Sequence, residues 1–531
     1  MHPSTDEVRL EALATTMSER IATTTRTLAT WVQQAPHGLQ EIEEHVLRIM
    51  KEVGASLVAA LCALCAPAHP PRTVPCPCGL PAAYQRQRPA TVTTILGPLS
   101  FQRPYYLCAA CGHGQHPLDA QLQLCAGSRS AGLDELLALL GATQDSFAEA
   151  ASVLERLTLV HLSSNTVRDA TEELGATLVA HQAQAVARTT SGHDLPAAAT
   201  PSPQRLYITM DGVLAHLHER GWSELKVGCC YQTTSQPDRK RREHQEIRAH
   251  SLSYVTALLE AESFGDHLWQ EAARRGVMEA EEVVVIGDGA HWIWNIAKTQ
   301  FPQATQLVDW YHASGYVWKA ASALWGESEP QRADWAHRQL ARLWEGKVEE
   351  VLLELEQHQG AGEGITEALS YYTTHRGRME YAAYRERGLQ IGSGSVESGC
   401  KQLVSARLKG AGMIWDGSGA EQVAVVRAWL KSGRWEEAMA LRRAPGRSYQ
   451  RKSCVREGEK DGTGVGGEQA AAVGPAAVPS SRGLAPEVLA QVRAEMVQER
   501  QQHPWRRPWS SKQQRTHHEE RVGHTRPAAA A

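Results

Sequence analysis

Two close pairs of cysteines carry the clearest metal-binding signal in the sequence. A Cys-Pro-Cys-Gly run occupies 76–79, and a Cys-Ala-Ala-Cys-Gly run occupies 108–112, about 30 residues further on. Thiolates presented on two tight turns are the ligands of a tetrahedral structural zinc site, and the glycines allow such turns. We therefore predict a Zn²⁺ site in a zinc ribbon, with the ligands Cys76, Cys78, Cys108 and Cys111.

A second cysteine pair competes for this role. Cys62 and Cys65 have the usual two-residue ligand spacing, whereas the pair at Cys76 and Cys78 is one residue tighter. The sequence around Cys62 is apolar and helical in its periodicity, which favours small buried cysteines over ligands. Redox cysteines without a metal remain the alternative to the zinc ribbon.

Two aspartates follow apolar runs that are typical of buried strands. Asp211 comes directly after residues 206–210, Asp288 comes directly after residues 283–287, and each precedes a glycine. An unpaired carboxylate at the mouth of a buried strand is costly, so packing explains it poorly. Asp-Gly is also common turn chemistry. The repetition at two strand ends favours a functional role.

A third acid, Glu397, lies in the Gly-Ser-Gly-Ser-Val-Glu-Ser run at 392–398. It falls in the first turn of a predicted helix, where the helix dipole also favours a glutamate. Together with Asp211 and Asp288 it completes an oxygen-rich triad. Such a triad can hold two Mg²⁺ or Mn²⁺ ions about 3.5–4 Å apart, an arrangement used for phosphoryl transfer.

These motifs belong to one ordered series that extends over most of residues 40–440. Its other members are Arg-Pro-Tyr-Tyr at 103–106, Pro-Leu-Asp at 117–119, Phe-Pro at 301–302, Asp-Trp-Tyr-His at 309–312 and Gly-Met-Ile-Trp at 412–415. The series resembles bacterial insertion-sequence transposases of the DDE type, in the Kra branch that is allied to the Mutator-like elements.

The resemblance implies an RNase H-like catalytic domain that cuts the ends of an insertion sequence and joins them to target DNA. Asp211 would lie on the first strand, Asp288 at the end of the fourth and Glu397 on the closing helix. Asp309 also follows an apolar strand and is the main rival of Asp288. The implied partners are double-stranded DNA, as terminal inverted repeats and target, and further copies of the chain in a homo-oligomer.

Two other functions fit the same residues. A metal-dependent nuclease on this scaffold would cleave without strand transfer, and a zinc-ribbon DNA-binding protein derived from a transposase would do neither. Additional DNA contacts are expected from the helix that Ser163 or Ser164 caps, which fits a helix-turn-helix or an ordinary helical hairpin. Basic residues and a tryptophan near Glu397 are further candidates, although a buried core tryptophan is the simpler reading: Lys401, Arg407, Lys409 and Trp415.

The elements that position these residues give an α/β chain in several parts. We expect a helical region at 1–66, a zinc ribbon-like region at 67–120, a helical region at 121–188, an RNase H-like domain at 204–441 with a helical insertion at about 313–390, and a basic, largely disordered tail at 442–531 with a basic-aromatic motif at 503–509.

Composition sets the outer limits. The 531 residues are 42% hydrophobic and 21% charged, which excludes a chain disordered throughout. The net charge of −4 conceals a tail of +7 from Arg442 onward, a common arrangement in proteins that bind polyanions. Because neither a signal peptide nor a membrane span is visible, we expect a cytoplasmic, nucleoid-associated bacterial protein.

Overall fold

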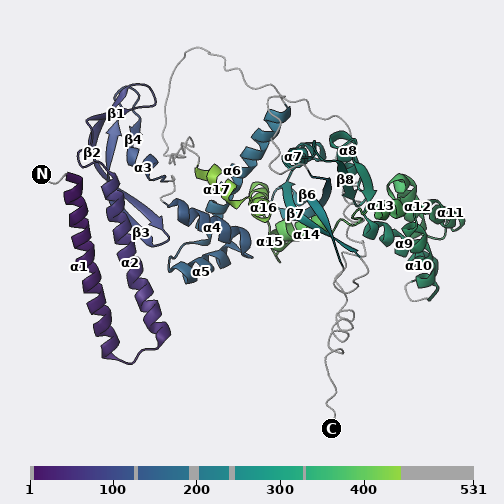
Figure 1. Ribbon diagram of the computed structural model, residues 1–531, viewed down its shortest axis with the longest axis horizontal. Coiled ribbons are helices and arrows are strands. Elements are labelled where there is room, and N and C mark those ends of the chain that lie inside the picture. The colour runs from purple at the N-terminus through teal and green to yellow at the C-terminus, as the bar shows by residue number, and fades with distance from the viewer. Residues whose placement is uncertain (1–4, 125–128, 191–202, 238–244, 327–329, 444–531) are drawn as a thin grey trace, which may run out of the picture. The chain divides into compact units, whose positions relative to one another are not determined.

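The computed structural model describes residues 5–124, 129–190, 203–237, 245–326 and 330–443 (Figure 1). The predicted linker at 189–203 and the basic tail at 442–531 fall almost wholly outside these residues. The described residues form two units. The first runs to Trp310 and resumes at His375, and the second contains Tyr311–Thr374.

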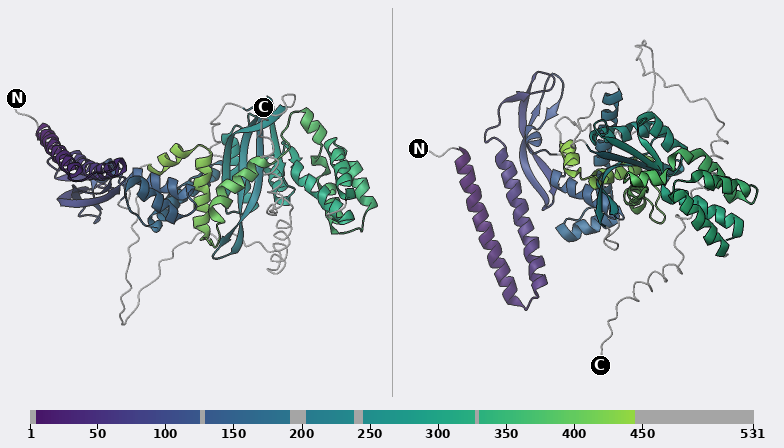
Figure 2. Two further views of the ribbon diagram at one scale, coloured as in Figure 1. Left: turned by 90° about the horizontal axis from the view of Figure 1, so that it is seen from below. Right: turned by 45° about the vertical axis from the view of Figure 1, so that its right-hand side comes forward.

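The first unit begins with two long antiparallel helices, α1 (Thr5–Gln34) and α2 (Leu39–Cys65) (Figure 2). Pro36 and Gly38 lie in the short connection between them, where the helix cannot continue. The guanidinium of Arg9 donates hydrogen bonds to the carbonyl oxygens of Ala63 (2.8 Å) and Ala66 (3.2 Å). The start of α1 therefore lies against the end of α2.

A four-stranded antiparallel sheet follows, in the order β1-β2-β3-β4. Its strands are β1 (Thr73–Pro75), β2 (Pro81–Thr94), β3 (Gly97–Leu107) and β4 (Gly114–Gln115). Alternate residues of β2 and β3, such as Val92 and Phe101, pack against Val58 and Cys62 of α2. In the described residues, the helices predicted within 1–66 and the β-rich segment predicted to about residue 118 are both present.

The region predicted to be helical at 121–188 is mostly helical in its described residues, and a short helix precedes it. The helices are α3 (Pro117–Gln121), α4 (Ala131–Thr143), α5 (Phe147–Thr158) and α6 (Ser164–Thr190). Ser130 and Ser146 cap α4 and α5, because each hydroxyl accepts the amide hydrogen of the third residue in its helix. Ser163 caps α6 in the same way, by accepting the Thr166 amide at 3.2 Å.

A five-stranded sheet forms the centre of the first unit, in the order β7-β6-β5-β8-β9. Neighbouring strands are antiparallel from β7 to β5 and parallel from β5 to β9. Its elements are β5 (Arg205–Leu217), β6 (Gly221–Pro237), β7 (Gln245–Ala257), α7 (Ala261–Arg274), β8 (Glu282–Gly287), α8 (His291–Gln300) and β9 (Thr305–Val308).

Helices cover both faces of this sheet. A Cβ atom at Gly228 of β6 would lie 2.6 Å from Leu268 of α7, and one at Gly399 would lie 3.5 Å from Val227 of β6. Val227 and Gly228 are successive strand residues and point to opposite faces. The sheet is therefore buried on both sides, which explains the continuous apolar run Leu206–Met210 in β5.

The second unit contains most of α9 and three further helices, as the predicted helical insertion requires. They are α9 (Trp310–Trp325), α10 (Pro330–Trp344), α11 (Val348–Gln357) and α12 (Glu363–His375). Its core combines aliphatic and aromatic side chains: Trp325 packs against Trp335 with ring centroids 5.7 Å apart, and Tyr316 stacks on Tyr371 at 3.8 Å.

The chain then returns to the first unit through a series of shorter helices. They are the 3₁₀ helix η1 (Arg376–Arg378), α13 (Tyr381–Glu386), α14 (Gly394–Gly399), the π-helical turn η2 (Cys400–Ser405), α15 (Ala406–Leu408), α16 (Gly417–Lys431) and α17 (Trp435–Arg443). The helix predicted from Gly394 to about Lys409 is present. Its π-helical turn was not predicted, and such turns occur often at functional sites.

Candidate metal-binding sites

The four predicted zinc ligands converge at one end of the small sheet. Cys76 and Cys78 lie between β1 and β2, and Cys108 and Cys111 lie between β3 and β4, with their sulfur atoms within 4.8 Å of one another. The Sγ–Sγ distances are 3.6 Å for Cys76–Cys111 and 3.6 Å for Cys78–Cys108. A zinc ion bound tetrahedrally at 2.3 Å requires sulfur separations of about 3.8 Å. The sulfur atoms are spaced for such an ion.

Two glycines shape the turns that carry these cysteines. Gly79 (φ +86°) and Gly112 (φ +69°) have left-handed backbones. Their amides donate hydrogen bonds to the carbonyl oxygens of Cys76 and Cys108, each at 2.9 Å. The backbone amide of Cys111 also hydrogen-bonds the Cys108 sulfur and lowers the pKa of that thiol to about 7. The thiolate is the metal-binding form, so Cys108 is the ligand that loses its proton most readily. Burial and hydrogen bonds to the neighbouring sulfurs raise the pKa of Cys76 to about 12, so the lowered pKa belongs to Cys108 and not to the whole cluster.

The rival cysteines lie elsewhere. Cys62 and Cys65 are on α2 and do not belong to the four-sulfur cluster. Cys62 packs against the apolar core beneath the small sheet, where burial raises the pKa of its thiol. Cys65 is exposed, so the expectation of burial is wrong for this residue. Neither Cys62 nor Cys65 is therefore placed to replace a ligand of the four-sulfur cluster.

Asp211 lies in the middle of β5 and is half-buried. The expectation that a strand ends just before Asp211 is wrong, because β5 continues through Gly212 to Leu217 and stays paired with β6. One carboxylate oxygen accepts a hydrogen bond from the Gly212 amide at 2.7 Å. The other lies 3.7 Å from the sulfur of Cys400, which can donate its thiol hydrogen. Cys400 begins the π-helical turn after α14, so Asp211 faces the helix that carries Glu397.

Asp288 and Asp309 follow neighbouring parallel strands. Gly287 at the end of β8 pairs with Val308 at the end of β9, and the Asp309 amide donates to the Gly287 carbonyl at 2.8 Å. Asp288 is half-buried and accepts the amide hydrogen of Ala290 at 2.9 Å, which is the turn geometry that Asp-Gly sequences favour. The two aspartates therefore emerge side by side from the sheet.

Asp309 is the most deeply buried acid of this region, with no exposed surface. The Ser393 amide donates a hydrogen bond to Asp309 at 2.9 Å, and the Ser393 hydroxyl donates to Glu397 at 3.3 Å. Asp309 and Glu397 offer ligand atoms within 4.8 Å of each other, together with His312 from the first turn of α9. A buried carboxylate thus fixes the start of the helix that presents Glu397.

The structure therefore brings Glu397 close to Asp309, and Asp211 close to the next turn of the same helix. Within the described residues, Asp211 and Asp288 belong to neither group of three or more ligand atoms at 4.8 Å. Sequence reasoning did not identify Ser393 and Cys400 as neighbours of the acids. Ser393 lies in the conspicuous Gly-Ser-Gly-Ser run, which could have drawn attention to it, whereas no sequence signal marks Cys400.

A buried histidine adjoins Asp288. Burial, and then the charge of Arg378, lower the pKa of His375 to about 4, although Asp288 acts in the opposite direction. The imidazole is therefore neutral at physiological pH. Its ring packs against Trp294 with centroids 6.0 Å apart. A neutral ring adds no positive charge that would compete with a cation near Asp288.

Two of the expected DNA contacts lie inside the protein. Trp415 is 8% exposed, and its backbone pairs with the end of β5, because its amide donates to the His216 carbonyl at 3.0 Å. Arg407 is 2% exposed, packs over the Trp415 ring at 5.0 Å and donates to the Gly141 carbonyl at 3.1 Å. The reading of Trp415 as a core residue is confirmed, and the placement of Arg407 at a DNA surface is wrong.

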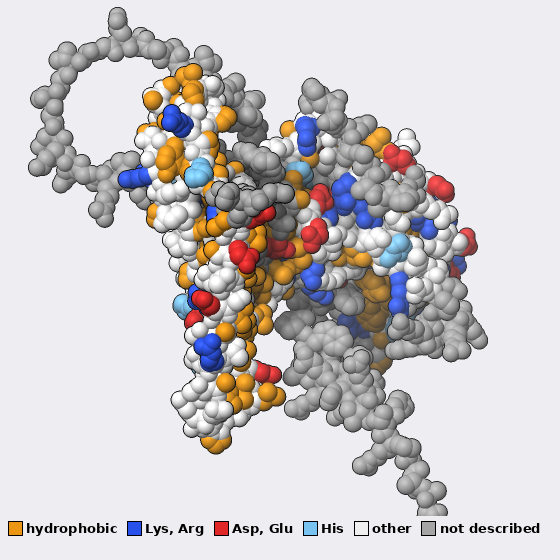
Figure 3. All heavy atoms as spheres, turned by 60° about the vertical axis from the view of Figure 1, so that its left-hand side comes forward, with side chains coloured by type: hydrophobic (Ala, Val, Ile, Leu, Met, Phe, Trp, Pro, Cys, Tyr) orange, Lys and Arg blue, Asp and Glu red, His pale blue; other side chains and the backbone are white. Residues whose placement is uncertain are grey.

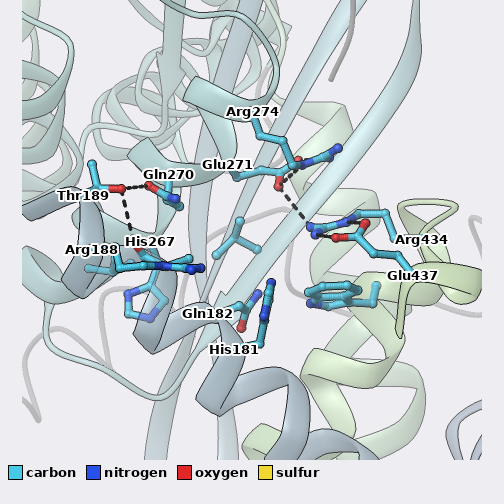
Figure 4. A pocket seen from close by; sticks show the side chains of 14 residues that line it. His181, Gln182, Arg188, Thr189, His267, Gln270, Glu271, Arg274, Arg434 and Glu437 are labelled. Atoms are coloured by element: carbon cyan, nitrogen blue, oxygen red, sulfur yellow. Dashed lines mark hydrogen bonds and ion pairs between the residues drawn. The ribbon is translucent and has the colours of Figure 1, made fainter. Parts of the chain in front are cut away.

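A cavity of about 290 Å³ lies elsewhere in the first unit (Figure 4). Its most buried charge, Glu271, binds Arg274 and also Arg434 (3.3 Å), and Arg434 binds Glu437 at 2.7 Å. These charges neutralise one another across α7 and α17. The network is therefore a structural link, and its charges are not directed at a ligand.

Within the described part of the chain, none of the helices is long and apolar enough to cross a membrane.

The chain matches one known family. The sequence model of an uncharacterised protein family, UPF0236, matches residues 37–443, a span that includes both candidate metal sites. No curated protein matches the chain.

Proposed function

We propose that this chain, which belongs to the uncharacterised family UPF0236, is a DDE transposase that cuts the ends of an insertion sequence and joins them to target DNA. The observation that carries the proposal is the placement of acids on the central sheet. Asp211 lies on β5, Asp288 follows β8, and Glu397 is on a helix that covers the sheet. The strand order β7-β6-β5-β8-β9 agrees with the RNase H-like fold that the motif series implies.

The three acids fit the chemistry of divalent cations. Asp211, Asp288 and Glu397 are all half-buried, so their carboxylates can be reached from solvent. Two Mg²⁺ or Mn²⁺ ions held there would supply the activated nucleophile and the neutralised leaving oxygen that phosphodiester attack requires. Asp211 and Asp288 hold their orientation through backbone amides, namely those of Gly212 and Ala290.

Asp309 has a different part in this proposal. It is fully buried and its carboxylate accepts the Ser393 amide, so it fixes the start of α14. We assign Asp309 as a positioning residue for Glu397 and Asp288 as the second metal-binding acid. The opposite assignment predicts a different pair of mutant phenotypes and is tested below.

The small sheet would bind DNA. The four cysteines suit Zn²⁺, which would hold the two turns together as a structural ion. Arg86 is exposed on β2, and the neighbouring guanidinium of Arg88 lies over the Tyr105 ring at 3.8 Å. Arginines fixed on a rigid sheet are suited to phosphate contacts. We assign terminal-repeat binding to this sheet, together with α5 and α6.

The test is a strand-transfer assay with the full chain. Labelled duplexes that contain the inverted repeats flanking the gene are incubated with the protein and Mn²⁺, alongside a plasmid target. We expect nicked or cut ends and end–plasmid joined products. Glu397→Gln should form neither product and should still shift the labelled duplex in a gel.

Other outcomes would identify the alternatives. Cut ends without joined products in every condition would favour a nuclease on the same scaffold. A gel shift with no cutting by the wild-type protein, in Mn²⁺ and in Mg²⁺, would favour a DNA-binding protein. Cutting by Glu397→Gln at the wild-type rate would contradict the proposed metal site.

A further inference from the structure

The N-terminal helices pack against each other through one apolar stripe on each. On α1 this stripe contains Leu13, Met17 and Leu28, which are half-buried, and on α2 it contains Ile49 and the buried Val53. Positions three, four and seven residues apart share a helix face, which explains how these residues meet across the hairpin. This contact uses only part of the apolar surface of each helix.

Each helix carries a second apolar stripe, and this one is exposed. Leu10 is 62% and Leu39 is 72% exposed. The exposed residues recur about every three turns on α1 and alternately every two turns and one turn on α2. Figure 3 shows hydrophobic side chains along the surface of this hairpin. The exposed residues are Leu10, Ile21 and Val32 on α1 and Leu39, Val46, Met50, Leu57 and Leu61 on α2.

The spacing places both exposed stripes on one face of the hairpin. At about 100° per residue, the five α2 residues fall within an arc of about 60°. The exposed stripe is rotated from the stripe that faces the other helix by roughly 50° on α1, where the two stripes adjoin, and by roughly 70° on α2. Because the helices are antiparallel, the same sense of rotation carries both stripes to the same side. The result is a continuous apolar face two helices wide.

The small sheet does not cover this face. It packs against α2 through Val58, Ala59 and Cys62, and Leu96 approaches Gly54. At about 100° per residue, Val58, Ala59 and Cys62 lie about 60–160° further around α2 than Leu61, whereas Gly54 lies about 20° from Leu61, at the edge of the exposed stripe. The sheet therefore covers one side of α2, α1 covers another, and the exposed stripe lies between them.

We propose that this face binds the same face of a second copy of the chain, which forms a four-helix bundle at the core of a dimer. A helix of 27 residues is about 40 Å long, and two packed helices make a face about 20 Å wide, or about 800 Å². That is the area each partner contributes to a standard stable interface. The inference does not depend on the proposed chemistry.

Charge and symmetry favour a second copy as the partner. Between Leu10 and Val32 the exposed α1 stripe contains Ala14 and Thr25 and no charged residue, and Glu43 is the charged residue within the α2 stripe. Apart from Glu43 the face is uncharged, so two copies can meet along most of its length without repulsion. A two-fold axis closes such a contact, as in most homodimers.

The test measures the mass of the full chain in solution without DNA. Analytical ultracentrifugation over a range of micromolar concentrations should show a dimer. The double variant Val46→Glu, Met50→Glu should raise the dimer dissociation constant at least 100-fold. The control variant Gln40→Glu, Arg48→Gln makes the same change in net charge at exposed positions of the same helix outside the stripe, and should dimerise like the wild type.

Circular dichroism separates loss of association from loss of folding. Val46 and Met50 are exposed, so both double variants should keep the wild-type helical signal. A wild-type chain that stays monomeric at about 50 µM would have a dimer dissociation constant above that concentration, and this result would overturn the proposal. Equal dimerisation by the stripe variant and the wild type would overturn it as well. Glu397→Gln should dimerise normally, so the outcome is independent of catalysis.

Discussion

The two candidate metal sites are built in different ways. The cysteine site uses two turns of one small sheet, and its ligands lie within 36 positions of the chain, from Cys76 to Cys111. The proposed acidic site takes Asp211 from strand β5, Asp288 from the turn after β8 and Glu397 from helix α14 of the central sheet domain. The ligands of a site made of local turns can be assigned from their spacing in the sequence. The ligands of a site made of distant elements come together only through the fold of the whole domain.

The difference has an energetic consequence. The small sheet has a modest apolar core, so an ion bound by four cysteines would contribute directly to its folding. The acids lie on a domain whose two-sided sheet is stable without them. Substitutions in the cysteine site should therefore act on stability, and substitutions in the acidic site should act on catalysis.

The largest effect is expected at Glu397 and Asp211. Glu397→Gln and Asp211→Asn should each reduce strand cleavage and joining by at least about 10³-fold, because each removes a charged ligand of the reacting metals. The free energy of unfolding should change by less than about 0.5 kcal/mol, since both side chains are half-exposed. Product yields and urea denaturation measure the two effects. A large loss of stability with residual activity would mean that the acids, like the cysteines, act mainly on folding.

Asp288 and Asp309 should behave differently from each other. Asp288→Ala should abolish activity at unchanged stability. Asp309→Ala should lower activity and also destabilise the fold by about 1–3 kcal/mol, because it leaves the buried Ser393 amide without its acceptor. Thermal melts and strand-transfer yields on both variants are the measurement. An active Asp288→Ala protein and an inactive, fully stable Asp309→Ala protein would transfer the metal-binding role to Asp309.

The cysteine site should show the opposite pattern. Cys108→Ser should release zinc from the purified protein and expose the small sheet to proteolysis, and it should weaken duplex binding. Cys65→Ser is the matched control, because Cys65 is a free cysteine outside the cluster. Zinc is measured with a colorimetric chelator after denaturation. A Cys108→Ser protein with wild-type zinc content would contradict a four-cysteine site.

The smallest effect is expected at Ser393. Its hydroxyl donates to Glu397 at 3.3 Å, while its amide, which binds Asp309, is kept in any variant. Ser393→Ala should lower activity about tenfold, a usual cost of removing a group that orients a metal ligand. Stability should fall by about 1 kcal/mol. Loss of activity as complete as in Glu397→Gln would mean that Ser393 takes part more directly.

The cysteine site could be predicted from the sequence more completely than the acidic site. The four cysteines could be assigned because their spacing and the flanking glycines fix the turns. The strands that end before Asp288 and Asp309 could be assigned from their apolar runs. The apolar run before Asp211 indicated a strand but not that it continues through Asp211 to Leu217. The contact between Asp309 and Ser393 could not, because 84 positions and a helical unit separate the two residues.

Burial on helices was harder to foresee. Arginine is usually exposed, yet the guanidinium of Arg407 lies over the Phe147 ring at 4.3 Å in the core. The periodicity of α1 and α2 identified helices but not which apolar stripe would stay exposed. Both outcomes depend on neighbours that are distant in the chain, and local pattern carries no information about them.

The central claim is that Asp211, Asp288 and Glu397 bind divalent cations. Its most direct test is a Mn²⁺ titration of the zinc-loaded full chain, followed by electron paramagnetic resonance of free Mn²⁺. We predict saturable binding by the wild-type protein and loss of that binding in Glu397→Gln, with zinc content unchanged. Equal Mn²⁺ binding by the two proteins would contradict the account.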